Sequence, residues 1–523
     1  MPFPKAGMDW KFVWKNALLP SKCRTATTGP TTFVAACMIQ ILVLLCALVA
    51  WIDTAEAAGP NVIFILADDL GYADLSCQGA TDIRTPNIDR LAREGTRFTS
   101  YYVSQAVCTA SRASLLSGCY ANRVGLQGAL NHTSRIGIHP EEWLLPEMFK
   151  DRGYATACIG KWHLGTLAEF NPLRNGFDEW LGLPYSNDNS KYHPVLAAEM
   201  PPLPLYDGDA VIELDPDQSQ FTRRFTERAV QFIERHEDRP FFLYLPHVMP
   251  HVPIFASEAF KGRSSRGLYG DVVEELDWSV GEILQALDRL NLAGDTLVLF
   301  SSDNGAWLSY GEHAGCNRPF REGKLTCFEG GVRVPMLVRW PGQVPAGRVC
   351  DAAFMAIDWL PTLTAIAGGK DSKRKIDGVN VAALLFGQES PPPHEALFFY
   401  AGNELQAVRS GRFKLHVAHP YLTTAGEPGR GGKPSDWGKG APRAITDSSM
   451  DAIASRHGQK VERLELSLFD LEADPAETKN MATDHPEIVE MLVRLVDQMR
   501  GDLGDSLTGA KGEGRRDAAE KAL

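Results

Sequence analysis

The sequence predicts an α/β fold in which a large mixed β-sheet is sandwiched by helices and followed by a smaller α+β domain. Two patterns support this: short apolar runs alternate with helical patterns from Asn61 onward, and the composition changes at residues 387–393, GQESPPP. The chain has 523 residues, 44% of them hydrophobic and 23% charged, which excludes wholesale disorder and collagen. A net charge of −12 argues against nucleic acid as a partner.

Four apolar runs are predicted to be buried strands, and polar residues follow each of them. The runs cover residues 61–67, 155–159, 241–245 and 296–301, and they lie just before Asp68-Asp69, Gly160-Lys161, Pro246-His247 and Asp303-Asn304. Between the strands, apolar residues recur at helical spacing in residues 225–233 and 273–287. Because ligands bind beyond the carboxyl ends of strands in open α/β sheets, we expect the functional site there.

The C-terminal part of the chain is predicted to form a second, smaller domain. Residues 59–390 are predicted to form the main domain and residues 391–505 the smaller one. Its predicted elements are strands at 396–400, 406–409, 413–417 and 466–470, and a helix over about 486–501. Residues 425–460 are rich in Gly, Lys and Ser, which is typical of a long surface loop. The polar tail, residues 506–523, is predicted to be frayed.

The first 58 residues have the pattern of a targeting segment. Residues 33–52 form an unbroken apolar run after several basic residues, and Ala55-x-Ala57 fits a signal-peptidase site. We therefore expect residues 1–58 to be a signal peptide and the protein to be exported, to the periplasm or outside the cell. An uncleaved membrane anchor is the alternative, because about 20 apolar residues can span a bilayer.

The acidic strand ends predict a metal site. Asp68, Asp69, Asp303 and Asn304 together offer only hard oxygen ligands, which suit Ca²⁺. Mg²⁺ is a lesser possibility because it demands tighter octahedral geometry. An isolated Asp-Asp pair is more often a solvated turn or a helix N-cap, but two acidic strand ends at one sheet edge would repel each other without a cation.

Cys108 begins the segment C-T-A-S-R-A-S-L-L-S-G. A helix is predicted from Ser111 to Leu116, which places Cys108 just ahead of a helix N-terminus, where the dipole favours an anion. Taken alone, the cysteine would be expected to form half of a disulfide in an exported protein.

The segment C-T-A-S-R followed by A-S-L-L-S-G resembles the modification motif of the type I sulfatase family, in which the cysteine is oxidised to formylglycine. Ala110 stands where proline is commonest in that family. The resemblance covers roughly residues 60–500. Its other motifs are Asn61 to Leu75, Thr85 to Ala92, Gly160-Lys-Trp-His-Leu-Gly165, Val252-Pro253 after His251, Ser302-Asp-Asn-Gly305, Gly323-Lys324, Glu329-Gly-Gly-Val-Arg333 and Leu468 to Pro475.

The resemblance implies the alkaline-phosphatase-like fold, a sulfuric ester hydrolase of arylsulfatase type, and a specific set of site residues. It implies that Ca²⁺ is bound by Asp68, Asp69, Asp303, Asn304 and the modified Cys108. Arg112 and Lys161 would hold the hydrated aldehyde, and His163, His251 and Lys324 would surround the sulfate and the ester oxygen. His247 competes with His251, although only His251 precedes the x-Pro as the family's histidine does. Singly, each of these side chains could be an ordinary surface charge or a packed ring.

The expected mechanism starts from hydration of the formylglycine. One hydroxyl would attack sulfur after losing its proton to a carboxylate, for which Asp303 is the candidate. His251 or Lys324 would protonate the leaving ester oxygen. His163 would accept the proton of the second hydroxyl as sulfate is expelled.

The sequence indicates the class of substrate but not a particular compound. We expect a sulfated carbohydrate or an aryl sulfate, selected by segments 183–215 and 425–460 at the rim of the site. The protein would also need a formylglycine-generating or equivalent maturation enzyme, and its oligomeric state is open. The alternatives are a phosphate or phosphonate monoester hydrolase of the same superfamily and a catalytically silent binder of sulfated glycans.

Cysteine arithmetic completes the expectations. Three of the ten cysteines lie in the targeting segment, and Cys108 is assigned to the aldehyde. The remaining six are Cys77, Cys119, Cys158, Cys316, Cys327 and Cys350, which permits up to three disulfides. Cys316 and Cys327 flank Lys324 and are the first pair to test.

Overall fold

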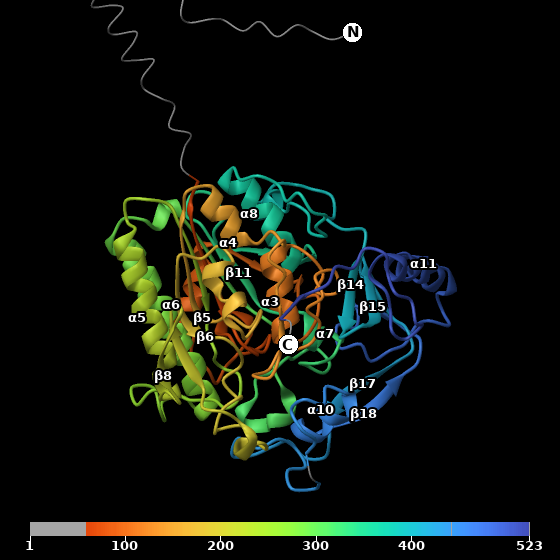
Figure 1. Ribbon diagram of the computed structural model, residues 1–523. Helices are drawn as coiled ribbons and strands as arrows, with labels where there is room; N and C mark the ends of the chain where they lie inside the picture. Colours follow the sequence, from red (N-terminus) through yellow and green to blue (C-terminus); the bar gives the residue numbers. More distant parts are fainter. Residues whose placement is uncertain (1–58, 441, 522–523) are drawn as a thin grey trace, which may run out of the picture. The chain divides into compact units, whose positions relative to one another are not determined.

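The computed structural model describes residues 59–440 and 442–521, which form one compact unit. The predicted signal peptide or anchor, residues 1–58, lies outside the described residues. Within the described part, no helix is long and apolar enough to cross a membrane. A ten-stranded sheet forms the centre of the larger part, and a four-stranded sheet with a long helix lies beside it (Figure 1).

The large sheet is mixed, as predicted. Its five central strands, from β10 to β6, are parallel, while the pairs β10–β11, β11–β2, β6–β7 and β7–β8 are antiparallel. In spatial order the strands are β12 (Arg348–Cys350), β2 (Thr96–Phe98), β11 (Met336–Arg339), β10 (Thr296–Ser302), β1 (Asn61–Ala67), β9 (Phe241–Pro246), β5 (Ala155–Lys161), β6 (Glu179–Leu183), β7 (Pro204–Asp207) and β8 (Ala210–Leu214).

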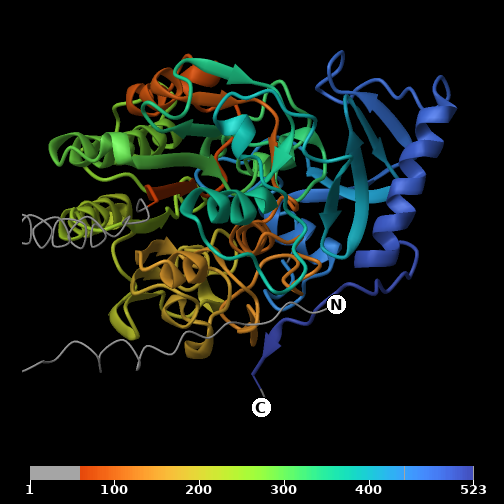
Figure 2. The same ribbon diagram turned by 90° about the horizontal axis from the view of Figure 1, so that it is seen from above.

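Helices cover both faces of this sheet, and this explains why its central strands are apolar throughout. In β1 the alternate residues Val62, Phe64 and Leu66 belong to one core, and Ile63 and Ile65 to the other. Side chains of α3 (Cys108–Ser117), α4 (Leu145–Asp151) and α8 (Trp359–Ala367) complete the first core, and those of α2 (Pro86–Glu94), α5 (Phe221–Arg235) and α6 (Leu268–Arg289) the second. Figure 2 shows the two helical layers on either side of the strands.

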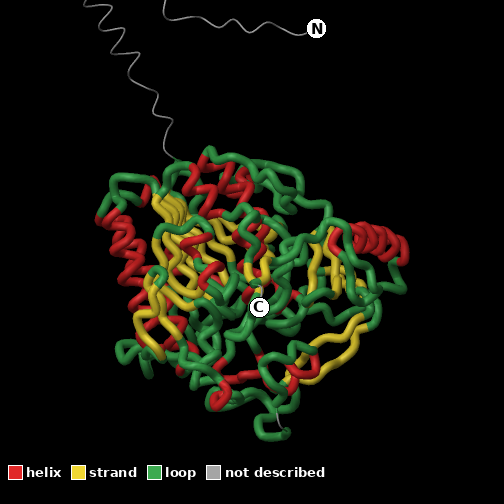
Figure 3. The backbone as a smooth tube through the Cα atoms, in the orientation of Figure 1, coloured by secondary structure: helices red, strands yellow, loops and turns green. Residues whose placement is uncertain are grey.

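The smaller sheet is antiparallel and contains the strands predicted for the C-terminal segment. Its order is β14 (Leu397–Ala401), β15 (Glu404–Ser410), β16 (Phe413–His416) and β19 (Ser467–Asp470). Helix α11 (Pro486–Leu503) packs against β15, with Leu492 and Val496 buried. In Figure 3 this second group of strands is separate from the large sheet, with the helix on its outer side.

The prediction of a long surface loop at residues 425–460 was wrong in part. The segment connects β17 (His419–Thr424) to β18 (Gln459–Leu464), and it contains the helix α10 (Met450–His457). Ser449 caps the helix by accepting a hydrogen bond from the backbone N–H of Ala452. The helix packs on β18 and buries His457, because local capping and tertiary packing outweigh a loop-like composition.

The prediction of a frayed tail was also wrong for the described residues up to 521. The short strand β20 (Ala519–Glu520) pairs with β4 (Ile136–Gly137), and the Arg123 guanidinium donates to the carbonyl of Gly514 at 2.8 Å. The Arg516 guanidinium donates at 2.7 Å to the buried carboxylate of Glu142. The polar residues of this tail therefore form hydrogen bonds and a partly buried ion pair that hold it against the main domain.

No disulfide links the seven cysteines of the described residues, so the pairing considered for Cys316 and Cys327 is absent. Cys119, Cys158, Cys327 and Cys350 are buried in the first core, where thiols pack as small apolar groups.

Candidate active site

The carboxyl ends of β1 and β10 bring the acidic residues together. Ala67 pairs with Ser302 across the two parallel strands, so Asp68 and Asp303 leave the sheet side by side. The backbone N–H of Asp69 donates to Oδ1 of Asp303 at 3.1 Å, and the Nδ2 of Asn304 donates to Oδ1 of Asp69 at 2.6 Å. All four side chains are buried.

Cys108 lies over this acidic group. The helix α3 begins at Cys108 itself, rather than after it as the sequence predicted. The thiol donates to Oδ1 of Asp68 at 3.3 Å, and Nζ of Lys324 lies 3.4 Å from Sγ. Burial and the neighbouring Asp68 raise the pKa of this thiol well above its ordinary value.

Three buried cations face the three carboxylates. The Arg112 guanidinium donates to Oδ2 of Asp303 at 2.9 Å and to the carbonyl of Lys161 at 2.8 Å. Nζ of Lys161 lies 2.5 Å from Oδ2 of Asp68, and Nζ of Lys324 lies 2.8 Å from Oδ1 of Asp69. The charges therefore balance within the protein before any ligand is added.

These neighbours separate the pKa values of the aspartates. Burial raises the pKa of Asp68, but Lys161 and Arg112 outweigh it and hold the pKa well below its ordinary value. Burial and the charge of Asp68 raise the pKa of Asp303 to about 6, even though Arg112 opposes the rise. Such a difference between adjacent carboxyls is typical of active sites.

Of the three candidate histidines, His163 and His251 line the cavity, whereas His247 lies in the core. Nε2 of His163 lies 2.7 Å from the carbonyl of Leu130, and its buried Nδ1 has no hydrogen-bond partner among the described residues. Nε2 of His251 lies 3.7 Å from Oδ2 of Asp69. His247 instead contacts Ser279 of α6 at 3.2 Å, and burial lowers its pKa to about 3. The structure thus brings His251, and not His247, to the other site residues.

Three site residues hold a left-handed backbone. Asp69, His163 and Leu325 have φ of 65°, 64° and 72°. Non-glycine residues adopt this conformation at a cost, and it is held where surrounding contacts impose it. The backbone N–H of Leu325 donates to the carbonyl of Ala106 at 2.8 Å, which fixes the loop that carries Lys324.

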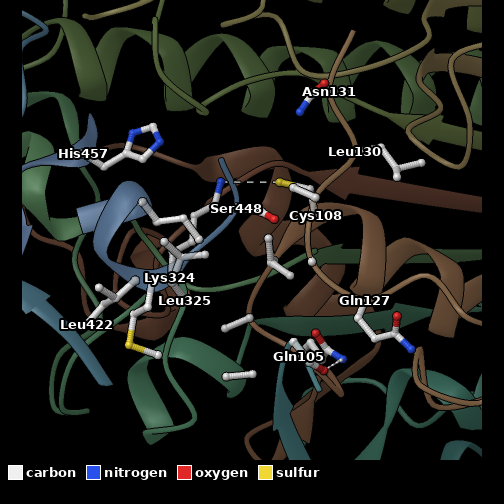
Figure 4. A pocket seen from close by; sticks show the side chains of 18 of the residues that line it. Gln105, Cys108, Gln127, Leu130, Asn131, Lys324, Leu325, Leu422, Ser448 and His457 are labelled. Carbon is white, nitrogen blue, oxygen red and sulfur yellow. Dashed lines mark hydrogen bonds between the residues drawn. The ribbon is translucent and has the colours of Figure 1, made fainter. Parts of the chain in front are cut away.

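A cavity of about 550 Å³ opens above Cys108. Both predicted rim segments line it: 183–215 supplies Ser186, Asp188 and Asn189, and 425–460 supplies Ile445, Ser448, Met450, Ile453, Arg456 and His457. Figure 4 shows Lys324 pointing to Cys108, with Leu325 and Leu422 on one side of the cavity and Gln105 and Gln127 on another.

Sequence reasoning missed three side chains that line this cavity. The centroid of the Trp307 ring lies 4.2 Å from Nζ of Lys324 and 4.2 Å from the centroid of the His457 ring, with the two rings tilted by 42°. Gln105 lies three residues before Cys108. For Gln105 and Trp307 the adjacent motifs were a signal of proximity. His457 lies in the predicted rim segment 425–460, but no motif marks it individually because tertiary packing of α10 brings it to the site.

The donor set fits a divalent cation. Asp68, Asp69, Cys108 and His251 each offer a ligand atom, and these atoms all lie within 4.8 Å of one another. Oδ1 of Asn304 is buried and has no hydrogen-bond partner among the described residues. A buried carbonyl oxygen without a donor beside three carboxylates is suited to a hard cation.

Comparison with known families identifies the family of the chain. The sulfatase family profile matches residues 60–369, and the profile for the C-terminal region of aryl-sulfatase matches residues 392–511. The chain therefore belongs to the sulfatase family, whose enzymes hydrolyse sulfuric esters.

Individual relatives give the same class. N-acetylgalactosamine-6-sulfatase of Sus scrofa is 40% identical over 385 residues, covering 69% of this chain and 72% of the relative. Arylsulfatase A of Homo sapiens is 36% identical over 467 residues, covering 84% and 88%. These relatives support sulfatase activity in this chain.

Solved structures confirm the fold. The PsFucS1 sulfatase from Pseudoalteromonas sp. matches with a TM-score of 0.73 at 24% identity, covering 88% of this chain and 92% of that one. Ps i-CgsB in complex with k-i-k-neocarrahexaose matches with a TM-score of 0.67 at 28% identity, covering 84% and 92%. The phosphonate monoester hydrolase of Agrobacterium radiobacter shares the fold alone, at 19% identity.

Proposed function

We propose that this sulfatase uses a formylglycine made from Cys108, together with Ca²⁺, to release sulfate from a sulfated carbohydrate or aryl sulfate. The observation that carries the proposal is the position of Cys108. Its Sγ lies 3.3 Å from a carboxylate oxygen of Asp68 and 3.4 Å from Nζ of Lys324, at the base of the cavity.

Residues of this chain fit both absent groups. Asp68, Asp69, Asp303, Asn304 and the modified Cys108 would hold Ca²⁺, which would supply positive charge next to the sulfuryl oxygens; Mg²⁺ suits this set less well. A formylglycine at Cys108 would supply, once hydrated, an oxygen nucleophile that the buried neutral thiol does not. A maturation enzyme is required for that conversion.

The cations of the chain would position the nucleophile and the ester. Arg112 and Lys161 are anchored by Asp303 and Asp68, which keeps both next to residue 108. Nζ of Lys324 lies 3.4 Å from Sγ, and Lys324 would neutralise charge on the ester. Such fixed donors need no rearrangement as negative charge develops.

Proton transfers are assigned to Asp303, His163, and either His251 or Lys324. Asp303 is the carboxylate assigned to accept the proton of the attacking hydroxyl. Nε2 of His163 lies 2.7 Å from the carbonyl oxygen of Leu130, which can only accept, so Nε2 carries the ring proton and the unpartnered Nδ1 is left as the acceptor. His251 or Lys324 would protonate the ester oxygen of the leaving alcohol.

Two alternatives are less well supported. A phosphate or phosphonate monoester hydrolase would use a similar sheet, but the hydrolase of that type matches at 19% identity, whereas sulfatases reach 40%. A silent binder of sulfated glycans would be expected to lack part of the site, yet Cys108, Arg112, Lys161 and the aspartates are all present and adjacent.

The central test is mass analysis of the peptide that contains Cys108, after expression with a formylglycine-generating enzyme. We expect the mass of the aldehyde, and Cys108→Ala should abolish hydrolysis of 4-nitrophenyl sulfate without changing the melting temperature. Cys77→Ala, outside the cavity, is the matched control and should keep activity. A Cys108 that stays a plain thiol in active enzyme would contradict the proposal, as would a higher kcat/KM for 4-nitrophenyl phosphate.

A further inference from the structure

Gln105 carries a buried acceptor that no residue of the chain uses. The side chain is 1% exposed and lines the cavity that holds Cys108 (Figure 4). Its Oε1 is buried without a hydrogen-bond partner among the described residues. Leaving a buried acceptor unpaired is costly, and such atoms in a cavity indicate the chemistry of a ligand.

The orientation of this amide is fixed by its neighbours. Nε2 of Gln105 donates to Oδ1 of Asn122 at 2.7 Å and to the carbonyl of Gly402 at 3.1 Å. Nδ2 of Asn122 donates to the same carbonyl at 3.0 Å. Because a backbone carbonyl can only accept, both amides must present nitrogen to Gly402. Oε1 of Gln105 is therefore the remaining acceptor, and the turn between β14 and β15 holds it in place.

An acceptor at this position does not suit the sulfate itself. Sulfate oxygens are acceptors too, and they are matched by the donors Arg112, Lys161 and Lys324 around Cys108. Oε1 of Gln105 needs an O–H or N–H group, which only the alcohol part of the ester can provide. Leu325 and Leu422 lie on another side of the cavity, where the apolar face of a ring could pack.

We propose that Gln105 is a specificity-determining residue that accepts a hydrogen bond from a hydroxyl or N–H group of the leaving alcohol. The preferred substrates are then sulfate esters of polyhydroxylated alcohols, such as sugars, and simple aryl sulfates are poorer ones. This inference rests on the proposed function. It follows from the acceptor, because a site built around a hydrogen bond discriminates against substrates that lack the donor.

The test compares two substrate types in the same variants of the matured enzyme. Gln105→Met keeps the length of the side chain but removes the acceptor. We expect kcat/KM for N-acetylgalactosamine 4- or 6-sulfate to fall by about tenfold, and kcat/KM for 4-nitrophenyl sulfate to stay unchanged. Gln105→Asn keeps an amide but shortens its reach. It should also lower the ratio of kcat/KM for the sugar sulfate to kcat/KM for 4-nitrophenyl sulfate. Gln388→Met, the same change at an exposed glutamine, should leave both values as they are.

The outcomes distinguish a failure of the Gln105 proposal from a failure of the proposed function. An equal loss on both esters in the Gln105 variants would show a structural role only and would overturn the inference. So would an unchanged ratio, or a wild-type enzyme that hydrolyses the aryl ester but neither sugar sulfate. A wild-type enzyme with an unconverted Cys108 and no turnover of any sulfate ester would instead refute the proposed function, and the inference with it.

Discussion

Two clusters of buried charge in this molecule have similar compositions and different surroundings. The cavity cluster consists of Asp68, Asp69, Asp303, Arg112, Lys161 and Lys324, and the interior cluster consists of Glu329, Glu477, Lys414, His416 and Arg333. The interior cluster joins β16 to α7 (Glu329–Val332). Both contain carboxylates and cations in contact, and most of these side chains are fully buried.

The interior cluster satisfies its own carboxylates. Nζ of Lys414 lies 2.9 Å from Oε1 of Glu329 and 3.1 Å from Oε1 of Glu477. Oε2 of Glu477 accepts the backbone N–H of Glu329 at 2.6 Å, and Oε2 of Glu329 accepts from Tyr102 at 2.6 Å. The cavity cluster instead reaches a cavity through Lys324, and the adjacent Asn304 has a buried Oδ1 without a hydrogen-bond partner among the described residues. Because Nδ1 of His416 in the interior cluster is also buried without a partner, burial, charge and unpaired atoms do not identify an active site on their own. Contact with a cavity distinguishes the two clusters.

Of these experiments, calcium removal should show the largest difference between the cavity cluster and the interior cluster. Treatment with a chelator is expected to abolish hydrolysis of 4-nitrophenyl sulfate, because the cavity cluster loses its proposed cation. Added Ca²⁺ should restore activity and raise the melting temperature through preferential binding to the folded state. A calcium titration monitored by both readouts checks this. Full activity in metal-free enzyme would show that the cavity cluster, like the interior one, is complete without an ion.

Lys414→Met tests the interior cluster. Removing this cation leaves two buried carboxylates without their shared partner, and the free energy of unfolding should fall by about 3–5 kcal/mol. Denaturant unfolding measures the loss. The activity of the remaining folded molecules should be unchanged, and a lowered kcat would mean that the interior cluster also serves catalysis.

Lys324→Met is the same substitution in the cavity cluster. We expect kcat to fall by about 100- to 1,000-fold, because a fixed donor to the ester is lost. Steady-state kinetics at saturating calcium checks this value. The melting temperature should drop less than in Lys414→Met, since bound Ca²⁺ still compensates Asp69. A variant that unfolds without a change in kcat would reverse the assignment of the two clusters.

Glu477 gives the interior cluster a pH dependence. Burial raises the pKa of Glu477 to about 7, with Lys414 opposing the rise and Glu329 adding to it. The folded state thus holds this proton more tightly than the unfolded chain, so its contribution to stability is lost as pH rises from about 5 to 7. Glu477→Gln should flatten that decline in melting temperature. Parallel slopes for the two proteins would contradict the assignment.

Arg516→Ala should have the smallest effect on stability among these substitutions. The Arg516–Glu142 pair is partly exposed, and Glu142 keeps a second partner in Arg374. We expect a loss of about 1 kcal/mol in the free energy of unfolding, with no change in kcat. Thermal or denaturant unfolding measures it, and a loss as large as that of Lys414→Met would show that the tail is a principal support of the fold.

The parts of the fold that the sequence predicted are those with strong local patterns. The strand β1 matches its prediction residue for residue, because a strand covered on both faces is apolar throughout. The helix α11 and the smaller sheet follow from ordinary amphipathic spacing. The tail and α10 were missed because buried ion pairs and long-range packing hold them, and neither leaves a periodic pattern.

The site was predictable to the extent that motifs mark it. Asp68 follows a strongly apolar run, and Cys108 and Lys324 lie in segments that resemble sulfatase motifs; the structure brings Cys108 within hydrogen-bond distance of both other residues. His457 and Gln105 are ordinary residue types whose roles depend on which neighbours satisfy their polar atoms. That property belongs to the folded chain and is not visible in composition or spacing.

The residues that line the cavity are synthesised at different times. Cys108 is synthesised early, whereas the turn at Gly402 and helix α10, which line the same cavity, are synthesised much later. Because proteins are synthesised from the N-terminus, Cys108 exists before these two parts of the cavity wall. A growing chain therefore exposes Cys108 for longer than the finished one does, in which this side chain is 2% exposed.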